Sequence, residues 1–311
     1  MSETAVVAFG GNALSLPEDR GRFDAQIERA ERALAPIAAW IARGDRVLFV
    51  HGNGPQVGHE LLRGAAVREL EAPPLDACVA STQGSMGYAL ERALRAVLGA
   101  SARVAALVTM VRVDLDDPAM ARPDKPVGPF YSASEAERLR ALHGWAVAED
   151  AGRGHRRVVP SPRPLEVIGV SAIRALLDAG YAVIAGGGGG VPVASRGGAD
   201  VGVEAVVDKD HTAALLGASL GAATLVDLTS VDAVYRDFGT ERASRLARAT
   251  LAEVRALAAE GHFPSGSMGP KIEAACAFLE AGGARVIITS LERLEPALRG
   301  EAGTWITEES A

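Results

Sequence analysis

The chain has 311 residues, of which 48% are apolar and 23% charged, so it is long enough to bury a full core and has a globular composition. Its net charge of -7 and pI near 5.5 argue against a face that binds nucleic acid, and we expect a small-molecule partner. The two cysteines, Cys78 and Cys276, lack CxxC spacing, and no apolar run approaches the roughly 20 residues that span a bilayer. With no signal-peptide pattern near Met1, these features predict a cytoplasmic protein without disulfides, structural zinc or a membrane partner.

Short apolar strand patterns alternate with helical patterns along most of the chain. The predicted strands are Ala5 to Phe9, Arg46 to His51, Arg103 to Val108, Ala182 to Ala185, Ala223 to Asp227 and Arg285 to Thr289. The predicted helices are Phe23 to Arg43, Thr82 to Leu98, Val170 to Ala179 and Ile272 to Ala281. This alternation predicts an α/β fold, a three-layer αβα sandwich with a mainly parallel central sheet. Ligands of such sheets bind at the carboxyl ends of the strands.

One stretch, Asp114 to Pro164, interrupts the alternation with repeated prolines, scattered aromatic residues and several charges. Repeated proline argues against a regular helix or a central strand, so we expect an irregular segment. Long insertions in compact domains are usually binding loops or lids, and we therefore predict a protruding lid-like subdomain within a single domain of residues 1–311. The alternative is a surface decoration. The prolines are Pro118, Pro123, Pro126, Pro129, Pro160, Pro162 and Pro164.

Three predicted strands run directly into glycine clusters. Gly10-Gly11-Asn12 follows the first strand, Gly52-Asn53-Gly54 the second, and the cluster from Gly186 to Gly190 the fourth. Glycine lets the backbone approach an anion, and a helix that begins just beyond adds the positive end of its dipole. One cluster alone is explained by a tight turn, but three together indicate a phosphate or carboxylate site. The chain has no GxxxxGK[ST] loop and no dinucleotide-type GxGxxG loop, so phosphate must be bound in another way.

Lysine is rare: of 32 lysine and arginine residues, only Lys125, Lys209 and Lys271 are lysine. Since the composition favours arginine, these lysines mark positions where arginine does not serve. A compact ammonium reaches a phosphoryl oxygen as a point charge, whereas a guanidinium requires a fork-shaped geometry. Phosphoryl transfer needs positive charge around the migrating group, so the three lysines are candidate catalytic residues. The alternative is that they are solvated surface charges.

Two aspartates flank Lys209 in the sequence. Asp210 is placed to orient Lys209 and Lys271 by charge-assisted hydrogen bonds, and Asp208 is placed to do the same or to hold magnesium through water. Either aspartate also suits the cap of a helix that begins here, and capping is compatible with both other roles.

At these residues the sequence closely resembles the carbamate kinases, a branch of the amino-acid kinase superfamily, over nearly the whole chain. The similar segments are Gly10 to Leu14, His51 to Gly58, Lys125 to Tyr131, Arg153 to Pro162, Gly186 to Pro192, Gly202 to Asp210 and Gly266 to Lys271. The resemblance implies an ATP-dependent phosphotransferase that converts ATP and carbamate reversibly into ADP and carbamoyl phosphate. It also implies magnesium carried by the nucleotide, no metal ligand assigned to the protein, and a homodimer.

The resemblance further implies roles for individual residues. Lys209 and Lys271 match a phosphoryl-stabilising pair, Asp210 matches the aspartate that organises this pair, and Lys125 replaces a lysine that many sister kinases carry in the first strand. The expected carbamoyl-binding backbone belongs to Gly10, Gly11, Asn12, Gly52, Asn53 and Gly54. The expected nucleotide-binding residues are Gly187, Gly188, Asp208, Thr229, Tyr235, Met268 and Gly269.

Two residues depart from the family pattern. Asp227 stands where the family strand is usually apolar, and Ser230 replaces an aspartate that is common in the following turn. We expect both to affect contacts with the nucleotide more than the chemistry. Two other functions stay open: a sister kinase with a different carboxylate, phosphonate or phosphate acceptor, and a nucleotide-binding regulator without turnover.

Overall fold

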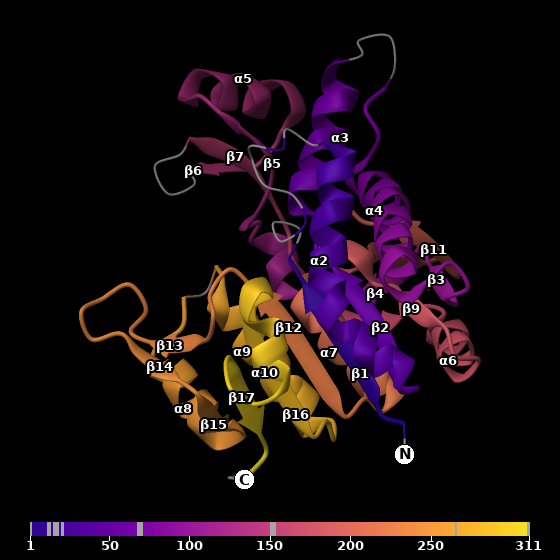
Figure 1. The fold of residues 1–311 in the computed structure, drawn as a ribbon. Helices are drawn as coiled ribbons and strands as arrows, with labels where there is room; N and C mark the ends of the chain where they lie inside the picture. The colour runs from indigo at the N-terminus through magenta and orange to yellow at the C-terminus, as the bar shows by residue number, and fades with distance from the viewer. Residues whose placement is uncertain are drawn as a thin grey trace.

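Figure 1 shows the chain as a computed structural model, which describes residues 2–10, 14, 19, 22–66, 71–149, 154–264 and 266–309. An eight-stranded sheet in the order β15-β17-β16-β12-β1-β2-β9-β3 forms its centre. The strands are β1 (Thr4–Phe9), β2 (Arg46–His51), β3 (Val104–Ala106), β9 (Ala182–Ile184), β12 (Thr224–Thr229), β15 (Arg248–Thr250), β16 (Arg285–Ser290) and β17 (Thr304–Thr307). The strands from β16 to β3 are mutually parallel, whereas β17 runs antiparallel to β16.

Helices cover both faces of this sheet, because the buried side chains of its central strand alternate between two apolar clusters. Val7 and Phe9 of β1 belong to the cluster that includes the inner faces of α2, α4 and α10, and Val6 and Ala8 belong to the cluster of α6, α7, α8 and α9. The predicted three-layer α/β fold is confirmed. The helices are α2 (Phe23–Ala42), α4 (Leu75–Leu98), α6 (Val170–Asp178), α7 (Lys209–Leu220), α8 (Leu251–Ala259), α9 (Met268–Glu280) and α10 (Leu294–Leu298).

Smaller elements surround the carboxyl edge of the sheet. A four-stranded sheet has the order β11-β10-β4-β8, and β13 and β14 form an antiparallel hairpin. These strands are β4 (Met110–Val113), β8 (Pro164–Val167), β10 (Val191–Arg196), β11 (Ala199–Gly202), β13 (Val234–Arg236) and β14 (Ser244–Leu246). Within the described residues, no helix is both long and apolar enough to cross a membrane.

The described residues of the segment from Asp114 to Pro164 are not irregular, and that prediction was wrong. It contains η2 (Pro118–Ala121), β5 (Lys125–Tyr131), α5 (Ala133–His143), β6 (Val147–Glu149) and β7 (His155–Val159), with the strands in a sheet of order β5-β7-β6. Proline is tolerated because β5 is an edge strand, where a missing N–H breaks no central ladder, and its register shifts between Val127 and Tyr131. Helix α5 contains no proline and begins with a capping box of Ser132 and Glu135.

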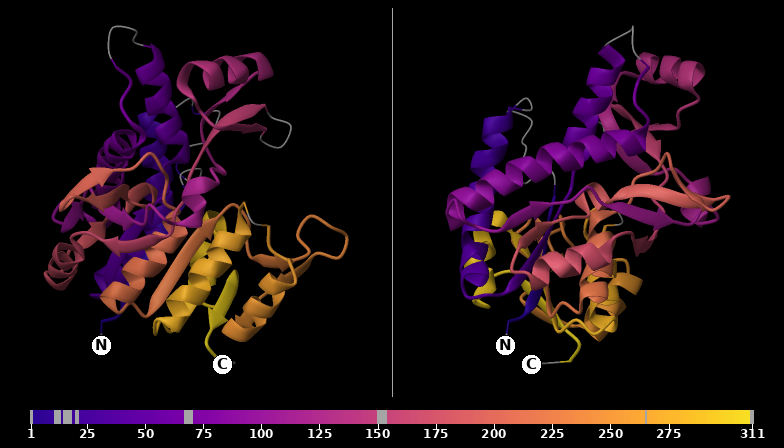
Figure 2. Two further views of the ribbon diagram at one scale, coloured as in Figure 1. Left: turned by 180° about the vertical axis from the view of Figure 1, so that it is seen from behind. Right: turned by 90° about the vertical axis from the view of Figure 1, so that its right-hand side faces the viewer.

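This small sheet and α5 stand away from the central sheet, alongside α3 (Gly54–Ala66), as both views in Figure 2 show. The contact between them is close, since a Cβ added at Gly58 of α3 would lie 3.5 Å from the Cα of Gly128 in β5. Strand β5 therefore reaches from the outlying sheet to the carboxyl edge of the main one, with Lys125 as its first residue.

Candidate active site

The glycine clusters gather at one edge of the central sheet. Because β1, β2 and β9 are parallel neighbours, Gly10, Gly52 and Gly186 all follow the carboxyl ends of their strands. The backbone N–H of Gly52 donates to the carbonyl oxygen of Phe9 at 2.7 Å. No described atom lies within 4 Å of a Cβ built on Gly10 or Gly54, which leaves space beside these loops. Gly11 and Asn12 lie outside the described residues.

The third glycine cluster has a packing reason that sequence reasoning missed. A Cβ added at Gly187 would lie 2.3 Å from Nε2 of His51, and one added at Gly188 would lie 2.2 Å from Nδ2 of Asn53. Asn53 is itself held by donating from Nδ2 to Oγ1 of Thr82 at 2.9 Å. Because Gly187 and Gly188 have no side chains, the third glycine loop can lie directly against His51 and Asn53 of the second loop.

His51, which packs against the third glycine loop, is buried and uncharged. The residue is 1% exposed, and burial lowers the pKa of its ring from 6.5 to about 4, although a hydrogen-bond contact between Nδ1 and the carbonyl oxygen of Gly52 acts in the opposite direction. The ring is therefore neutral near pH 7 and supports the loops by shape.

Lys209 and Lys271, which are far apart in sequence, meet above the carboxyl end of β12. Each ammonium contacts one oxygen of Asp210: Lys209 contacts Oδ1, and Lys271 contacts Oδ2 at 3.0 Å. Lys209 and Lys271 are each 11% exposed as side chains, and Asp210 is 8% exposed. Asp210 thus bridges the two lysines, which is the geometry that its predicted organising role requires.

Lys125 approaches the same edge from β5. Its ammonium lies 2.5 Å from Oδ2 of Asp208, whose Oδ1 accepts the backbone N–H of Asp210 at 2.9 Å. Asp208 therefore caps α7, as expected, and its ion-pair partner is Lys125, whereas the sequence had suggested Lys209 and Lys271. The side chains of Lys209, Asp210 and Lys271 form one connected set. Lys125 and Asp208 form a second pair, which meets this set through the backbone N–H of Asp210.

Asp227 belongs to this set as well: it was expected to affect nucleotide contacts more than the chemistry, and its side chain contacts the two candidate catalytic lysines. It lies in the middle of β12, is 3% exposed, and contacts Lys271 through both oxygens, at 3.0 Å and 3.1 Å. Its Oδ1 also lies 3.3 Å from the ammonium of Lys209. A second carboxylate therefore shares the lysine pair with Asp210.

The pKa values of the two aspartates are shifted in opposite directions, that of Asp210 downward and that of Asp227 upward. Burial acts to raise the pKa of Asp210, but Lys209 and Lys271 outweigh burial and hold that pKa well below its usual range. Burial raises the pKa of Asp227, and the neighbouring charge of Asp210 raises it further against the opposing effect of the lysines. The pKa of Lys209 is raised because its aspartate neighbours outweigh burial. The ammonium of Lys209 and the carboxylate of Asp210 are consequently charged near neutral pH.

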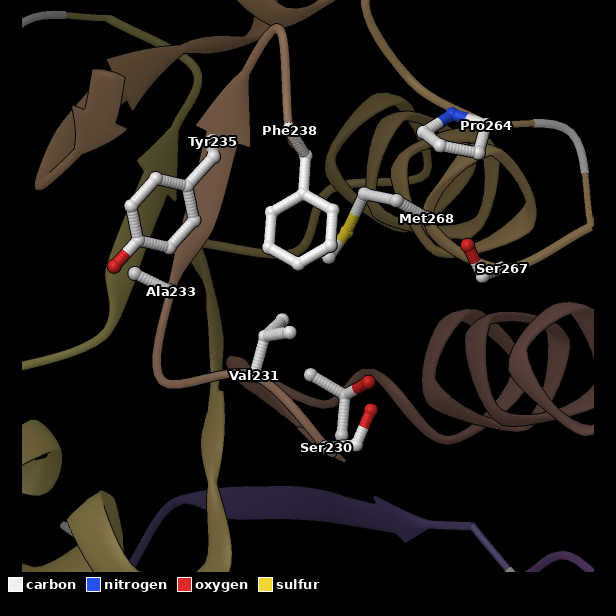
Figure 3. Close-up of a pocket in the computed structure, with 9 residues that line it drawn as sticks. Ser230, Val231, Ala233, Tyr235, Phe238, Pro264, Ser267 and Met268 are labelled. Atoms are coloured by element: carbon white, nitrogen blue, oxygen red, sulfur yellow. The ribbon is translucent and has the colours of Figure 1, made fainter. Parts of the chain in front are cut away.

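An apolar cavity of about 110 Å³ lies beside the lysines. Figure 3 shows the ring of Tyr235 on the left, the ring of Phe238 next to Met268 in the upper centre, Ser267 on the right, and Val231 below. The lining residues are Thr229, Ser230, Val231, Ala233, Tyr235, Phe238, Pro264, Ser267 and Met268. Thr229, Tyr235 and Met268, which were expected to bind the nucleotide, thus line one cavity together with Ser230.

The cavity and the lysine set share their supporting elements. Strand β12 carries Asp227 and ends at Thr229, while the first turn of α9 carries both Met268 and Lys271. A nucleotide with its base in the cavity would therefore direct its phosphates along the sheet edge toward the lysines. Gly269 stabilises this turn, since its N–H donates to the carbonyl oxygen of Pro264 at 2.9 Å. It is not among the residues that line the cavity.

Phe238 and Ser267 were missed from the sequence as lining residues. Phe238 follows β13 by two residues and is 54% exposed, so an exposed aromatic side chain close to Tyr235 was the available signal. Ser267 directly precedes Met268 and lies within the Gly266 to Lys271 motif, so this motif was the available signal.

An αβα sheet with lysines and an apolar cavity at its carboxyl edge defines a nucleotide-dependent phosphotransferase. The family model described as "Amino acid kinase family" matches residues 3–290, and the chain belongs to this family. It is 44% identical to the carbamate kinase of Pyrococcus horikoshii, an alignment that covers 99% of this chain and 100% of the relative. It is likewise 44% identical to carbamate kinase 2 of Enterococcus faecalis, with 97% and 98% covered. Among solved structures, the carbamate kinase of Giardia lamblia bound to AMP-PNP is 39% identical, with a TM-score of 0.91 and 99% of each chain covered. The family resemblance seen in the sequence is confirmed.

Proposed function

We propose that the chain is a carbamate kinase, which transfers a phosphoryl group reversibly between ATP and carbamate. The observation that carries the proposal is the convergence of Lys125, Lys209 and Lys271 at the sheet edge, beside the apolar cavity. Similarity to carbamate kinases over nearly the whole chain supports the choice of acceptor.

The lysines stabilise the phosphoryl group while it moves. An oxygen of carbamate attacks the γ-phosphorus of ATP, the bond from that phosphorus to the β-γ bridging oxygen breaks, and ADP leaves with the electron pair. Negative charge spreads over the phosphoryl oxygens during this step, and preorganised ammonium groups stabilise it more strongly in a partly buried site than in water. Lys209 and Lys271 supply two of these ammonium groups, and Lys125 supplies the third.

Asp210 acts as an organiser of the lysine pair. The attacking oxygen of carbamate is already anionic, and its transfer to carbamoyl phosphate releases no proton, so the reaction needs no general base. The pKa of Asp210, held low by Lys209 and Lys271, makes this carboxylate a poor proton acceptor near neutral pH. Its two oxygens instead fix the two ammonium groups relative to each other.

The glycine loops hold the acceptor, and the cavity holds the base of the nucleotide. We assign the carbamoyl group to the backbone of the first two loops, where Gly10 and Gly54 have open space beside them. We assign adenine to the cavity between Tyr235 and Met268, whose apolar lining suits a flat ring. Gly187 and Gly188 contribute indirectly to this site, because they let the third loop pack against His51 and Asn53 of the second loop.

Magnesium is proposed to enter with ATP or ADP, where it neutralises phosphate charge. Mg²⁺ keeps several waters in most proteins and is bound by phosphates together with one or two carboxylates. Asp208 suits such a water-mediated contact, since its side chain is 12% exposed and lies beside Lys125. We also propose a homodimer in the cytoplasm. The free thiols of Cys78 and Cys276 are compatible with a reducing compartment, and light scattering would test the dimer.

The decisive experiment is ATP formation from ADP and carbamoyl phosphate by the purified protein, with Lys271→Ala as the background control. We expect ATP to form with the wild type, and no comparable turnover in the forward direction with acetylglutamate or a nucleoside monophosphate as acceptor. Turnover with one of those acceptors but not with carbamate would assign a sister kinase. Binding of ATP without any turnover would assign a nucleotide-binding regulator.

A further inference from the structure

Asp227 is an unusual residue for its position in the sheet. Strand β12 lies between β1 and β16, and the residues paired with Asp227 on these strands are Ala8 and Ile288. Both neighbours are fully buried and apolar, and Asp227 is itself 3% exposed. An ionised carboxylate in such surroundings loses its hydration, so it persists only where cations replace the lost water.

The cations that face Asp227 are the two lysines assigned to the phosphoryl group. The ammonium of Lys271 has three N–H groups and three carboxylate oxygens within 3.1 Å, namely Oδ2 of Asp210 and both oxygens of Asp227. Its hydrogen-bonding capacity is therefore filled without any ligand. Lys209 contacts Oδ1 of each aspartate and retains one N–H group for a phosphoryl oxygen.

The charge of the pair is also cancelled. When Asp227 is ionised, Lys209 and Lys271 contribute two positive charges, and Asp210 and Asp227 contribute two negative charges. With Asp210 alone, the same group would carry one net positive charge toward an incoming phosphate. Lys125 and Asp208 form a separate pair and leave this balance unchanged.

We propose that Asp227 is a second positioning carboxylate, which competes with the nucleotide phosphates for Lys209 and Lys271 and so weakens nucleotide binding. The inference rests on the proposed phosphoryl-transfer role of the two lysines. Asp227 and Asp210 differ in what they do to the pair. Asp210 gives one oxygen to each lysine and holds them apart at a fixed spacing, whereas Asp227 directs both of its oxygens at Lys271.

This arrangement has a consequence for the catalytic cycle. A nucleotide phosphate that binds to Lys271 must displace Asp227 from its N–H groups. The free energy of binding is therefore reduced by that of the contact that is lost. Binding of ATP and ADP is then weaker than an uncompensated lysine pair would make it, and the bound product is released more readily. The raised pKa of Asp227, caused by burial and by Asp210, reflects the same crowding of negative charge in this place.

The test compares Asp227→Asn with the wild type by calorimetry, using AMP-PNP and magnesium at about pH 8 and low salt. Asparagine keeps the shape and removes the charge, and we expect AMP-PNP to bind about tenfold more tightly or better, because the removed charge lies within a few ångströms of the ammonium groups that the phosphates would contact. Steady-state kinetics should show a lower KM for ADP without an increase in kcat. If Asp227 served only to fill space, the variant would keep the wild-type KM for ADP, the wild-type kcat and the wild-type affinity for AMP-PNP.

Glu273→Gln is the matched control. Glu273 lies on α9 like Lys271, and its carboxylate contacts Arg163 and His211 on the outer side of the helix. Its removal changes the net charge of the protein by the same amount, and we expect the affinity for AMP-PNP to stay within about twofold of the wild type. An equal gain in Glu273→Gln would overturn the inference, because the effect would then come from overall charge.

Asp227→Leu covers the case in which asparagine disturbs folding, since leucine matches the apolar residues beside it on β1 and β16. Unchanged or weaker AMP-PNP binding in the folded Asp227 variants would overturn the inference. The two proposals fail separately. A wild type that forms ATP, with Asp227 variants of unchanged affinity, overturns only the role of Asp227. A wild type that forms no ATP overturns the proposed reaction, while calorimetry still measures the competition.

Discussion

Two sets of cationic groups reach the same site by different structural routes. Lys209 and Lys271 stand on helices that pack on the central sheet, are 11% exposed, and each contact two carboxylates. Lys125 stands on an edge strand of the outlying sheet, is 35% exposed, and contacts Asp208. The first pair is fixed by the core of the molecule, whereas Lys125 is placed by a unit that touches the body mainly along α3.

This difference indicates a division of labour. A charge held by a buried network is preorganised before the substrate arrives, which is what electrostatic stabilisation of a transition state requires. A charge on an outlying unit can be delivered when that unit closes, and closure also expels water and limits hydrolysis. We therefore propose that the Asp114 to Pro164 insertion is a lid that completes the site with Lys125.

The largest expected effect is on the fixed pair. Lys271→Ala and Lys209→Ala should each lower kcat by about 100-fold or more, because one preorganised charge donor is lost from the transition state. Replacement by arginine should restore little activity, since a planar guanidinium does not fit between Asp210 and Asp227. The measurement is the initial rate of ATP formation from ADP and carbamoyl phosphate.

Arg299→Ala is the control for this prediction, since Arg299 is an exposed cation that pairs with Glu295 and Glu301 far from the site. Its kcat should equal that of the wild type. Near-wild-type rates in both lysine variants would remove the fixed pair from the mechanism.

The second-largest expected effect is that of Lys125, the charge carried by the insertion. Lys125→Ala should lower kcat by about 10- to 100-fold while calorimetric affinity for AMP-PNP stays nearly unchanged, because the lid acts after the nucleotide is bound. Hydrogen exchange should show added protection of the amides of β5 and β7 when both substrates or a bisubstrate analogue are present. Arg138→Ala, at an exposed position of α5, is the control and should be fully active. Unchanged protection together with an active Lys125→Ala would identify the insertion as a rigid decoration.

The smallest expected effect is on the free energy of unfolding and its dependence on pH, through the buried ring of His51. The pKa of His51 is lowered from 6.5 to about 4, so between these values the unfolded chain binds a proton that the folded protein excludes. Stability should therefore fall as the pH is lowered from about 6.5 toward 4, with a loss on the order of 3 kcal/mol from this group. Urea unfolding at several pH values measures it. His51→Gln should flatten this part of the profile relative to the wild type, whereas His143→Gln, at an exposed position, should leave it as it is.

Much of the fold follows from local pattern. The runs that became β1, β2, β12 and β16 are apolar and β-branched, and their predicted bounds agree with the structure within two residues. The insertion shows where local pattern fails. Its prolines were interpreted as excluding regular structure, but an edge strand tolerates Pro126 and Pro129, and only the tertiary arrangement reveals that β5 is an edge. The capping box of Ser132 and Glu135 was a sequence signal for α5 that was not used.

The candidate site divides in the same way. The rarity of lysine, the aspartates beside Lys209 and the glycine clusters after strands are properties of the sequence itself, and they selected the residues that meet at the sheet edge. The sequence does not specify that Asp227 faces the lysines and not the nucleotide. Its contacts come from α7, 18 residues away, and from α9, 44 residues away. Periodicity determines whether a segment forms a strand or a helix. The partner that a buried side chain meets depends on which helices pack on which face of the sheet, and therefore only the tertiary structure decides it.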